Sequence, residues 1–124
     1  MRGMRLFALR GATDVAADER QAILDATATL LREILERNAL GPEDVVSAVF
    51  TVTGDLTAEF PAVAARENGF SAVPLLCARE IEVAGSMPRV VRVLMHYHAP
   101  EEHRPQHVYL GEARRLRLDL EGAQ

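Results

Sequence analysis

The chain has 124 residues, 48% of them hydrophobic and 26% charged, and this length predicts one domain over residues 1–124. Its eighteen acidic and fourteen cationic side chains give a formal net charge of -4 at pH 7. All fourteen cations are arginines, which excludes chemistry that needs a lysine: a Schiff base with a carbonyl substrate, covalently anchored pyridoxal phosphate or a Walker-type phosphate loop. The acidic balance, with only two Tyr and four Phe, argues against a nucleic-acid surface built on phosphate contacts and aromatic stacking.

The N-terminal half of the chain predicts two strands separated by a long helix. Residues 4–9 alternate weakly and indicate a first strand, which ends at the turn-like segment 10–13. A helix is predicted over about 19–38, with Asp18 as its N-cap. Its buried face is indicated by residues at three-to-four spacing: Ile23, Leu24, Thr27, Leu30, Leu31, Ile34 and Leu35. Residues 45–53 are β-branched and almost continuously apolar, which is typical of a strand covered on both faces.

The C-terminal half predicts one more helix and three more strands. A short helix runs from position 57 or 61 to position 68, and a brief strand follows at 73–77. A long strand is expected at 89–98 and a last short strand at 107–110. Residues 113–120 are predicted to form an irregular or briefly helical tail.

This order of elements predicts an α+β fold with α/β-like character, in which a mixed β-sheet carries the two main helices on one face. The other face also needs a cover, because the strands at 45–53 and 89–98 look apolar on both sides. We therefore expect that face to pack against another subunit, which makes the protein an oligomer.

Arg92 is the first candidate site residue, because it is the one polar side chain between positions 90 and 95 of an apolar strand. With period-two alternation it shares a face with Val90 and Leu94. A charge there needs either an internal carboxylate or an anion bound in a cavity. An arginine that reaches solvent at a strand edge is the alternative interpretation.

Cys77 and Glu80 form a second candidate pair. Residues three apart face opposite ways on an ideal strand, so their cooperation requires the chain to bend after Cys77. The alternative is structural: a lone cysteine is often a small buried hydrophobe, and Glu80 beside Arg79 is compatible with a solvated ion pair. No local feature marks Cys77 as a nucleophile.

Arg10 at the end of the first strand and Arg66 near the end of the short helix are further candidates, either as anion ligands or as surface charges. A metal hypothesis rests on four histidines: His96, His98, His103 and His107. No Asp-rich or Cys-rich segment accompanies them, so we do not expect a metal site. The hydrolase and nucleotide signatures GxSxG, GxGxxG and HExxH are absent.

The single Cys77 excludes an internal disulfide and any multi-cysteine zinc or iron–sulfur cluster. A reducing cytoplasm fits this cysteine usage best. The N-terminal apolar stretch is too short for a secretory signal, and no run approaches the ~18 apolar residues of a membrane span. We therefore expect a cytoplasmic protein with no membrane partner.

A set of short segments follows in one order along most of the chain: Arg10-Gly11-Ala12-Thr13, Asp55-Leu56, Phe60-Pro61, Arg66-Glu67, Val73-Pro74, Cys77, Glu80, Gly85, Arg92-Val93, Met95, His107-Val108-Tyr109-Leu110 and Leu116-Arg117-Leu118-Asp119-Leu120. In this order and spacing the chain resembles the small, monofunctional, trimeric α/β class of chorismate mutase. No single segment is specific, but their arrangement over nearly the whole chain is.

The resemblance implies the Claisen rearrangement of chorismate to prephenate in phenylalanine and tyrosine biosynthesis. This unimolecular step needs no cofactor, nucleophile or general base, which suits a sequence that lacks such groups. The resemblance also implies a homotrimer in which the sheets pack around the trimer axis as a pseudo-barrel and each active site lies at a subunit interface.

The resemblance assigns roles to nine side chains. It implies that Arg92 donates to the ether oxygen and a carboxylate, Arg10 and Tyr109 bind carboxylate, and Glu80 accepts from the ring hydroxyl with Cys77 beside it. It also implies that Phe60 and Arg66 come from the neighbouring subunit and that Leu116 and Arg117 close over the site. Val63 is a departure, because relatives can carry a lysine there.

Two alternatives remain open. A non-catalytic trimeric protein could use the same cleft for another small carboxylate, and an imine deaminase of similar trimeric architecture also grips its substrate by arginine. The pair Glu80 and Cys77 favours the mutase, because it suits a ring hydroxyl.

Overall fold

The structure, a computed structural model, describes residues 3–116. Its main elements are β1 (Met4–Asp14), α1 (Arg20–Arg37), β2 (Val45–Val52), α2 (Pro61–Ala65), β3 (Leu75–Arg79), β4 (Val90–Pro100) and β5 (Val108–Leu110). The strands form one sheet in the order β3-β2-β4-β1-β5. β4 pairs antiparallel with β1 and β2, whereas the outer pairs are parallel. The predicted α+β fold with a mixed sheet is therefore confirmed.

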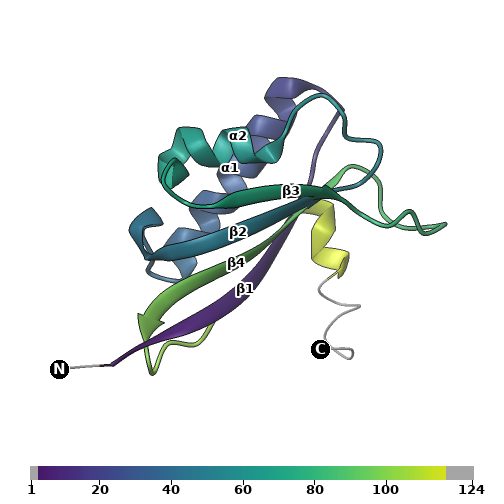
Figure 1. Cartoon of the computed structure of the whole chain (residues 1–124). Coiled ribbons are helices and arrows are strands. Elements are labelled where there is room, and N and C mark those ends of the chain that lie inside the picture. The colour runs from purple at the N-terminus through teal and green to yellow at the C-terminus, as the bar shows by residue number, and fades with distance from the viewer. Residues whose placement is uncertain (1–2, 117–124) are drawn as a thin grey trace.

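The core lies between the sheet and the two helices, which lie on the same side of it (Figure 1). The predicted helix over 19–38 is confirmed as α1, and six of the seven residues that the spacing indicated are buried, whereas Leu35 is half-buried; the six are Ile23, Leu24, Thr27, Leu30, Leu31 and Ile34. Four of them, Ile23, Leu30, Leu31 and Ile34, pack with alternate residues of the strands, among them Leu9, Phe50, Met95 and Tyr97. Burial of each such side chain contributes about 1.5–3 kcal/mol, so this layer holds the sheet in its register.

The predicted turn at 10–13 is wrong, because β1 continues to Asp14. Every residue from Arg10 to Asp14 has a partner on β4. Gly11 serves close packing here, since a Cβ at this position would meet Ile34 Cδ1 at 2.8 Å. A segment that looks like a turn in isolation is extended because a neighbouring strand binds it and a helix packs over it.

The predicted N-cap is also wrong. Glu19 precedes α1 without a side-chain capping bond, and Asp18 instead reaches the segment before α2. Its carboxylate accepts hydrogen bonds from the Thr57 N–H at 2.8 Å, the Thr57 hydroxyl at 2.9 Å and the Ala58 N–H at 3.0 Å. These donors lower the pKa of Asp18 below its usual value of 3.8. Asp18 therefore links the connections that lead into the two helices.

The second helix is shorter than expected. α2 ends at Ala65 and a wide helical turn over Arg66–Phe70 follows, with Gly69 at φ 98°. Glycine adopts this left-handed conformation without the steric cost of a Cβ. The chain can then return to the sheet as β3, which begins two residues later than the predicted strand at 73–77.

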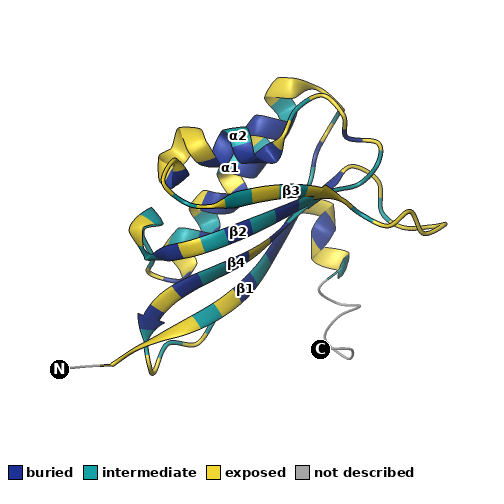
Figure 2. Cartoon of the chain, in the orientation of Figure 1, coloured by how far each residue is buried: buried dark blue, intermediate teal, exposed yellow. Residues whose placement is uncertain are grey.

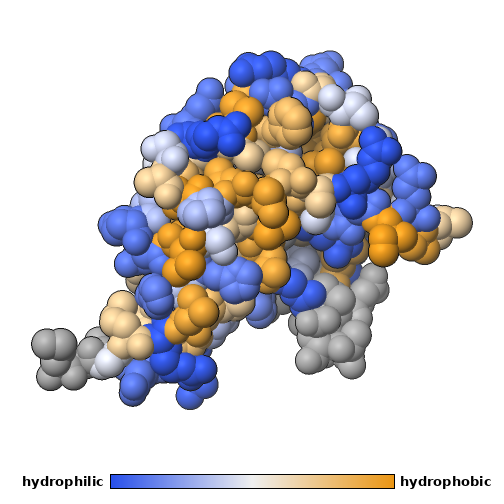
Figure 3. Space-filling view, viewed as in Figure 1, coloured by the Kyte–Doolittle hydropathy of each residue, from blue (hydrophilic) through white to orange (hydrophobic). Residues whose placement is uncertain are grey.

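One face of the sheet carries no helix, and we call it the uncovered sheet face (Figure 2). Met4 and Leu6 on β1, Leu76 on β3 and Leu94 on β4 are exposed there, and Leu76 is 70% exposed. Hydrophobic side chains gather over the sheet in the space-filling view (Figure 3). Exposed apolar area of this kind marks an interaction site more often than free surface. The expected partner subunit stays a prediction.

Candidate active site

A cavity of about 260 Å³ opens on the uncovered sheet face. Its polar lining comes from Arg10, Thr51, Arg92 and Tyr109, and its walls are completed by apolar residues such as Val49. Three of the nine predicted site residues thus surround one hollow. Two guanidinium groups beside apolar walls form a place that suits a small anion with a hydrophobic body.

Strand register brings these side chains together. Thr51 on β2 is the partner of Arg92 on β4, Arg92 is the partner of Ala12 on β1, and Ala12 is the partner of Tyr109 on β5. The four residues therefore form one row across the sheet and share a face. Ala12 is small, which leaves space between Arg92 and Tyr109. Arg10 lies two residues before Ala12 and so points to the same face.

Arg92 has an incomplete set of partners in the described part of the chain. Its Nε lies 3.6 Å from Glu80 Oε2, which is an ion pair but too long for a hydrogen bond. The Nε atom is buried and no described residue accepts a hydrogen bond from it. A buried donor without an acceptor is costly unless a ligand meets it, so the Arg92 side chain is available to an anion.

Glu80 is the first residue after β3 and lies at the edge of this cavity, beside Arg92 and Thr51. The Glu80 N–H donates to the Val52 carbonyl at 2.8 Å, which extends the pairing of β2 and β3 by one residue. The Thr51 hydroxyl donates to the same carboxylate oxygen, Oε2, that faces Arg92. Glu80 thus joins Arg92 on the uncovered sheet face.

Cys77 does not lie beside Glu80 within one chain. It is the register partner of Phe50 and packs against the core under the helices, on the opposite face of the sheet from the arginine cavity. It lines a separate hollow of about 460 Å³ together with Phe60, whose side chain is 66% exposed. Cys77 and Glu80 therefore lie on opposite faces of the sheet, as is usual for residues three apart along an extended chain.

The remaining predicted residues lie apart from the cavity or at its margin. Arg66 is exposed in the wide turn after α2. Leu116 packs against a small cluster that contains Ala12 and Tyr109, which brings the C-terminal segment to the same side of the sheet as the cavity. Arg117 lies outside the described residues.

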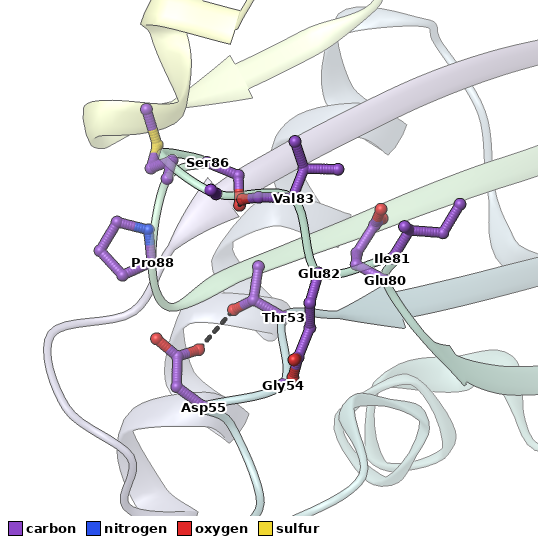
Figure 4. Close-up of a pocket in the computed structure, with 11 residues that line it drawn as sticks. Thr53, Gly54, Asp55, Glu80, Ile81, Glu82, Val83, Ser86 and Pro88 are labelled. Atoms are coloured by element: carbon purple, nitrogen blue, oxygen red, sulfur yellow. Dashed lines mark hydrogen bonds between the residues drawn. The ribbon is translucent and has the colours of Figure 1, made fainter.

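A third hollow, of about 440 Å³, lies between the end of β2 and the loop 80–88 (Figure 4). Asp55, Glu80 and Glu82 line it, and no described residue of its lining is cationic. The Thr53 hydroxyl donates to Asp55 at 2.6 Å, shown by the dashed line in Figure 4. Three carboxylates repel an anion, so the chemistry favours the arginine cavity as the site of anion binding.

The sequence did not indicate Thr51 as a site residue, because threonine is common in strands rich in β-branched residues and so does not stand out there. Two of the histidines make contacts outside the arginine cavity: His103 Nε2 lies 2.7 Å from the Tyr97 hydroxyl, and His96 Nδ1 lies 3.3 Å from the Ser47 hydroxyl. His107 Nδ1 accepts the backbone N–H of Arg10, which lines the cavity, at 3.0 Å. Within residues 3–116 no three His, Cys, Asp or Glu side chains could hold one metal ion. No helix among them has the length and apolarity to span a membrane.

Comparison with known proteins gives consistent matches. The family model for chorismate mutase type I matches residues 6–120. Chorismate mutase AroH of Thermus thermophilus is 51% identical over 119 residues, which cover 94% of this chain and 97% of that protein. Chorismate mutase AroH of Bacillus subtilis (strain 168) is 41% identical over 120 residues, 94% of each chain. A solved chorismate mutase from Clostridium thermocellum has a TM-score of 0.83 at 42% identity, covering 87% of this chain and 97% of that one.

These matches span nearly the whole chain in both sequence and fold. They imply an isomerase, and they support neither a non-catalytic carboxylate-binding protein nor an imine deaminase. The segments that carry the resemblance lie within the matched range, from Arg10 to Leu120. The chain belongs to the chorismate mutase type I family.

Proposed function

We propose that the chain converts chorismate to prephenate at the cavity lined by Arg10, Arg92 and Tyr109, with Glu80 at its edge. One observation carries the location: Arg92 interrupts an apolar strand face, and its buried Nε has no hydrogen bond to a described residue. An anion at this position would complete the partners of Arg92. Chorismate is a dianion with an apolar ring edge, which suits paired guanidinium groups beside Val49 and Leu94.

The reaction breaks the ether C–O bond and forms a C–C bond within one molecule, so the protein has no proton or electron pair to supply. It has two tasks: to hold the enolpyruvyl arm over the ring and to stabilise the negative charge that grows on the ether oxygen. We assign the second task to Arg92. Arg10 and Tyr109 hold carboxylate groups, and Glu80 accepts a hydrogen bond from the ring hydroxyl.

We further propose that the active site is completed by a neighbouring subunit in a homotrimer. Within one chain, Phe60 and Arg66 are exposed and lie away from the arginine cavity. The uncovered sheet face presents Met4, Leu6 and Leu94 to solvent, and a partner that covers it would bury this area. Phe60 would then contact the substrate ring and Arg66 would attract the dianion, across the subunit interface.

The C-terminal segment is proposed to close the site. Leu116 packs against the cluster that includes Tyr109, and the Asp14 carboxylate accepts the Glu112 N–H at 3.0 Å where this segment begins. Arg117 would follow directly and bring another guanidinium to the dianion. The free Cys77 thiol fits the expected cytoplasmic location.

The direct test is an assay of the purified chain with chorismate and no added metal or cofactor. We expect turnover well above the uncatalysed rate, followed through the loss of chorismate absorbance, with prephenate as product. Binding of chorismate without conversion would replace the enzyme by a binding protein. Light scattering should give the mass of a trimer, whereas an active monomer would refute the shared site.

A further inference from the structure

Thr51 occupies a place in the cavity that neither the sequence motifs nor the proposed catalytic roles explain. Its hydroxyl donates to Glu80 Oε2, and the same oxygen lies 3.6 Å from Arg92 Nε. Thr51 is also the direct cross-strand partner of Arg92. One carboxylate oxygen therefore faces both a neutral donor, which it binds, and a cationic donor, which it does not reach.

The gap between Glu80 and Arg92 is the informative feature. A guanidinium N–H and a carboxylate normally approach to about 2.7–2.9 Å, because a charge-assisted hydrogen bond is among the strongest in proteins. Here the pair stops at 3.6 Å although the Arg92 Nε is buried and no described residue accepts its proton. The oxygen that Thr51 binds is the same one that lies nearest to Arg92 Nε.

We propose that Thr51 is a positioning residue that keeps Glu80 and Arg92 apart so that both can act on the substrate. This inference rests on the proposed function. With Oε2 bound by Thr51, the Glu80 carboxylate presents Oε1, for which no hydrogen bond to a described residue is seen, to the ring hydroxyl of the substrate. Arg92 keeps its donor for the charge that develops in the transition state.

Strand structure alone does not require the hydroxyl. Valine has nearly the shape of threonine and an equal preference for strands, and Thr51 is only half-buried on the uncovered sheet face. Thr51→Val therefore removes the donor and keeps the packing, whereas Thr51→Ser keeps the donor and removes a methyl group. Thr27→Val is a matched control, because Thr27 lies on α1 beneath the opposite face of the sheet and its buried hydroxyl has no partner among the described residues.

In Thr51→Val the carboxylate should close on Arg92 and neutralise it. We expect kcat to fall about tenfold or more, the usual consequence of losing one hydrogen bond to a charged group, with a smaller change in KM. Thr51→Ser should recover most of kcat, and Thr27→Val should match the wild type. The urea midpoint of Thr51→Val should stay close to that of the wild type, because a merely structural role would lower it.

A double-mutant cycle separates positioning from independent effects. Glu80→Gln keeps an acceptor oxygen but removes the charge that Arg92 attracts, so Thr51→Val in that background should cost much less than tenfold. Single-turnover measurements with enzyme in excess keep slow variants measurable. An equal loss of kcat in both backgrounds, or failure of Thr51→Ser to recover it, would overturn the proposal. If the wild type itself does not convert chorismate, the proposed function fails; if it does and Thr51→Val matches it, only the role of Thr51 fails.

Discussion

Replacement of Arg92 by methionine tests the proposed chemistry, because the structure predicts a small effect on folding stability and a large effect on kcat. The Arg92–Glu80 pair spans 3.6 Å with side chains 42% and 27% exposed. Solvent screens such a pair, so its loss should change the free energy of unfolding by only about 0–1 kcal/mol. Removal of a donor aimed at transition-state charge typically costs about 2.7–4 kcal/mol, or about 10²–10³ in kcat. The effect on rate should therefore far exceed the effect on folding.

The assay compares kcat, KM and the urea midpoint of Arg92→Met with those of Arg37→Met. Arg37 makes a matched ion pair with Glu33 on the outer surface of α1, at 2.8 Å and with side chains 45% and 32% exposed. Both variants lose one partly exposed arginine–glutamate pair, but only Arg92 lines the cavity. We expect the control to keep wild-type kcat and KM.

Two outcomes would contradict the proposed role of Arg92. A rise in KM with unchanged kcat would make Arg92 a substrate anchor with no special role in the transition state. A loss of kcat accompanied by an equal loss of folding free energy would make the effect structural. Arg92→Lys adds a further check, because a compact ammonium cannot reproduce the planar fork of donors and should leave kcat low.

Three other predictions concern the scaffold. Gly11→Ala should destabilise the fold by about 1–3 kcal/mol in urea unfolding, because its Cβ would press on the buried Ile34 and lie 3.2 Å from the backbone carbonyl oxygen of Val108, its partner on β5; unchanged stability would contradict the close packing. Asp18→Asn should lower stability at neutral pH and make stability less sensitive to acid. Because the pKa of Asp18 is lowered in the folded state, its carboxylate stabilises the fold above pH 3.8, and this contribution is lost at lower pH as the carboxylate is protonated. Identical profiles of stability against pH for the variant and the wild type would exclude this role. Burial raises the pKa of Tyr97 to about 12, so wild-type stability should fall as pH rises from 10 to 12, a loss that Tyr97→Phe should not show.

Local pattern was sufficient for most of the elements. The apolar spacing on α1 has a period of 3.6, and the β-branched runs have the composition of strands, so both are visible in short windows of sequence. The prediction failed at Asp18 and at the segment 10–13, where local signals compete with distant partners. Asp18 has the usual side chain for an N-cap but binds Thr57, and Gly11 resembles a turn residue but lies under α1.

Patterns along the chain were enough to predict the fold class, the family and the anomaly of a charge at Arg92 within an apolar strand. They could not show that Thr51, Arg92 and Tyr109 form one row, because register depends on pairing between segments far apart in the chain. They also left open whether Cys77 and Glu80 meet. Both points depend on how the strands pair in the folded chain, because hydrogen bonds across the five strands set which side chains share a face, and a shift of the register by one residue would move them to the other face.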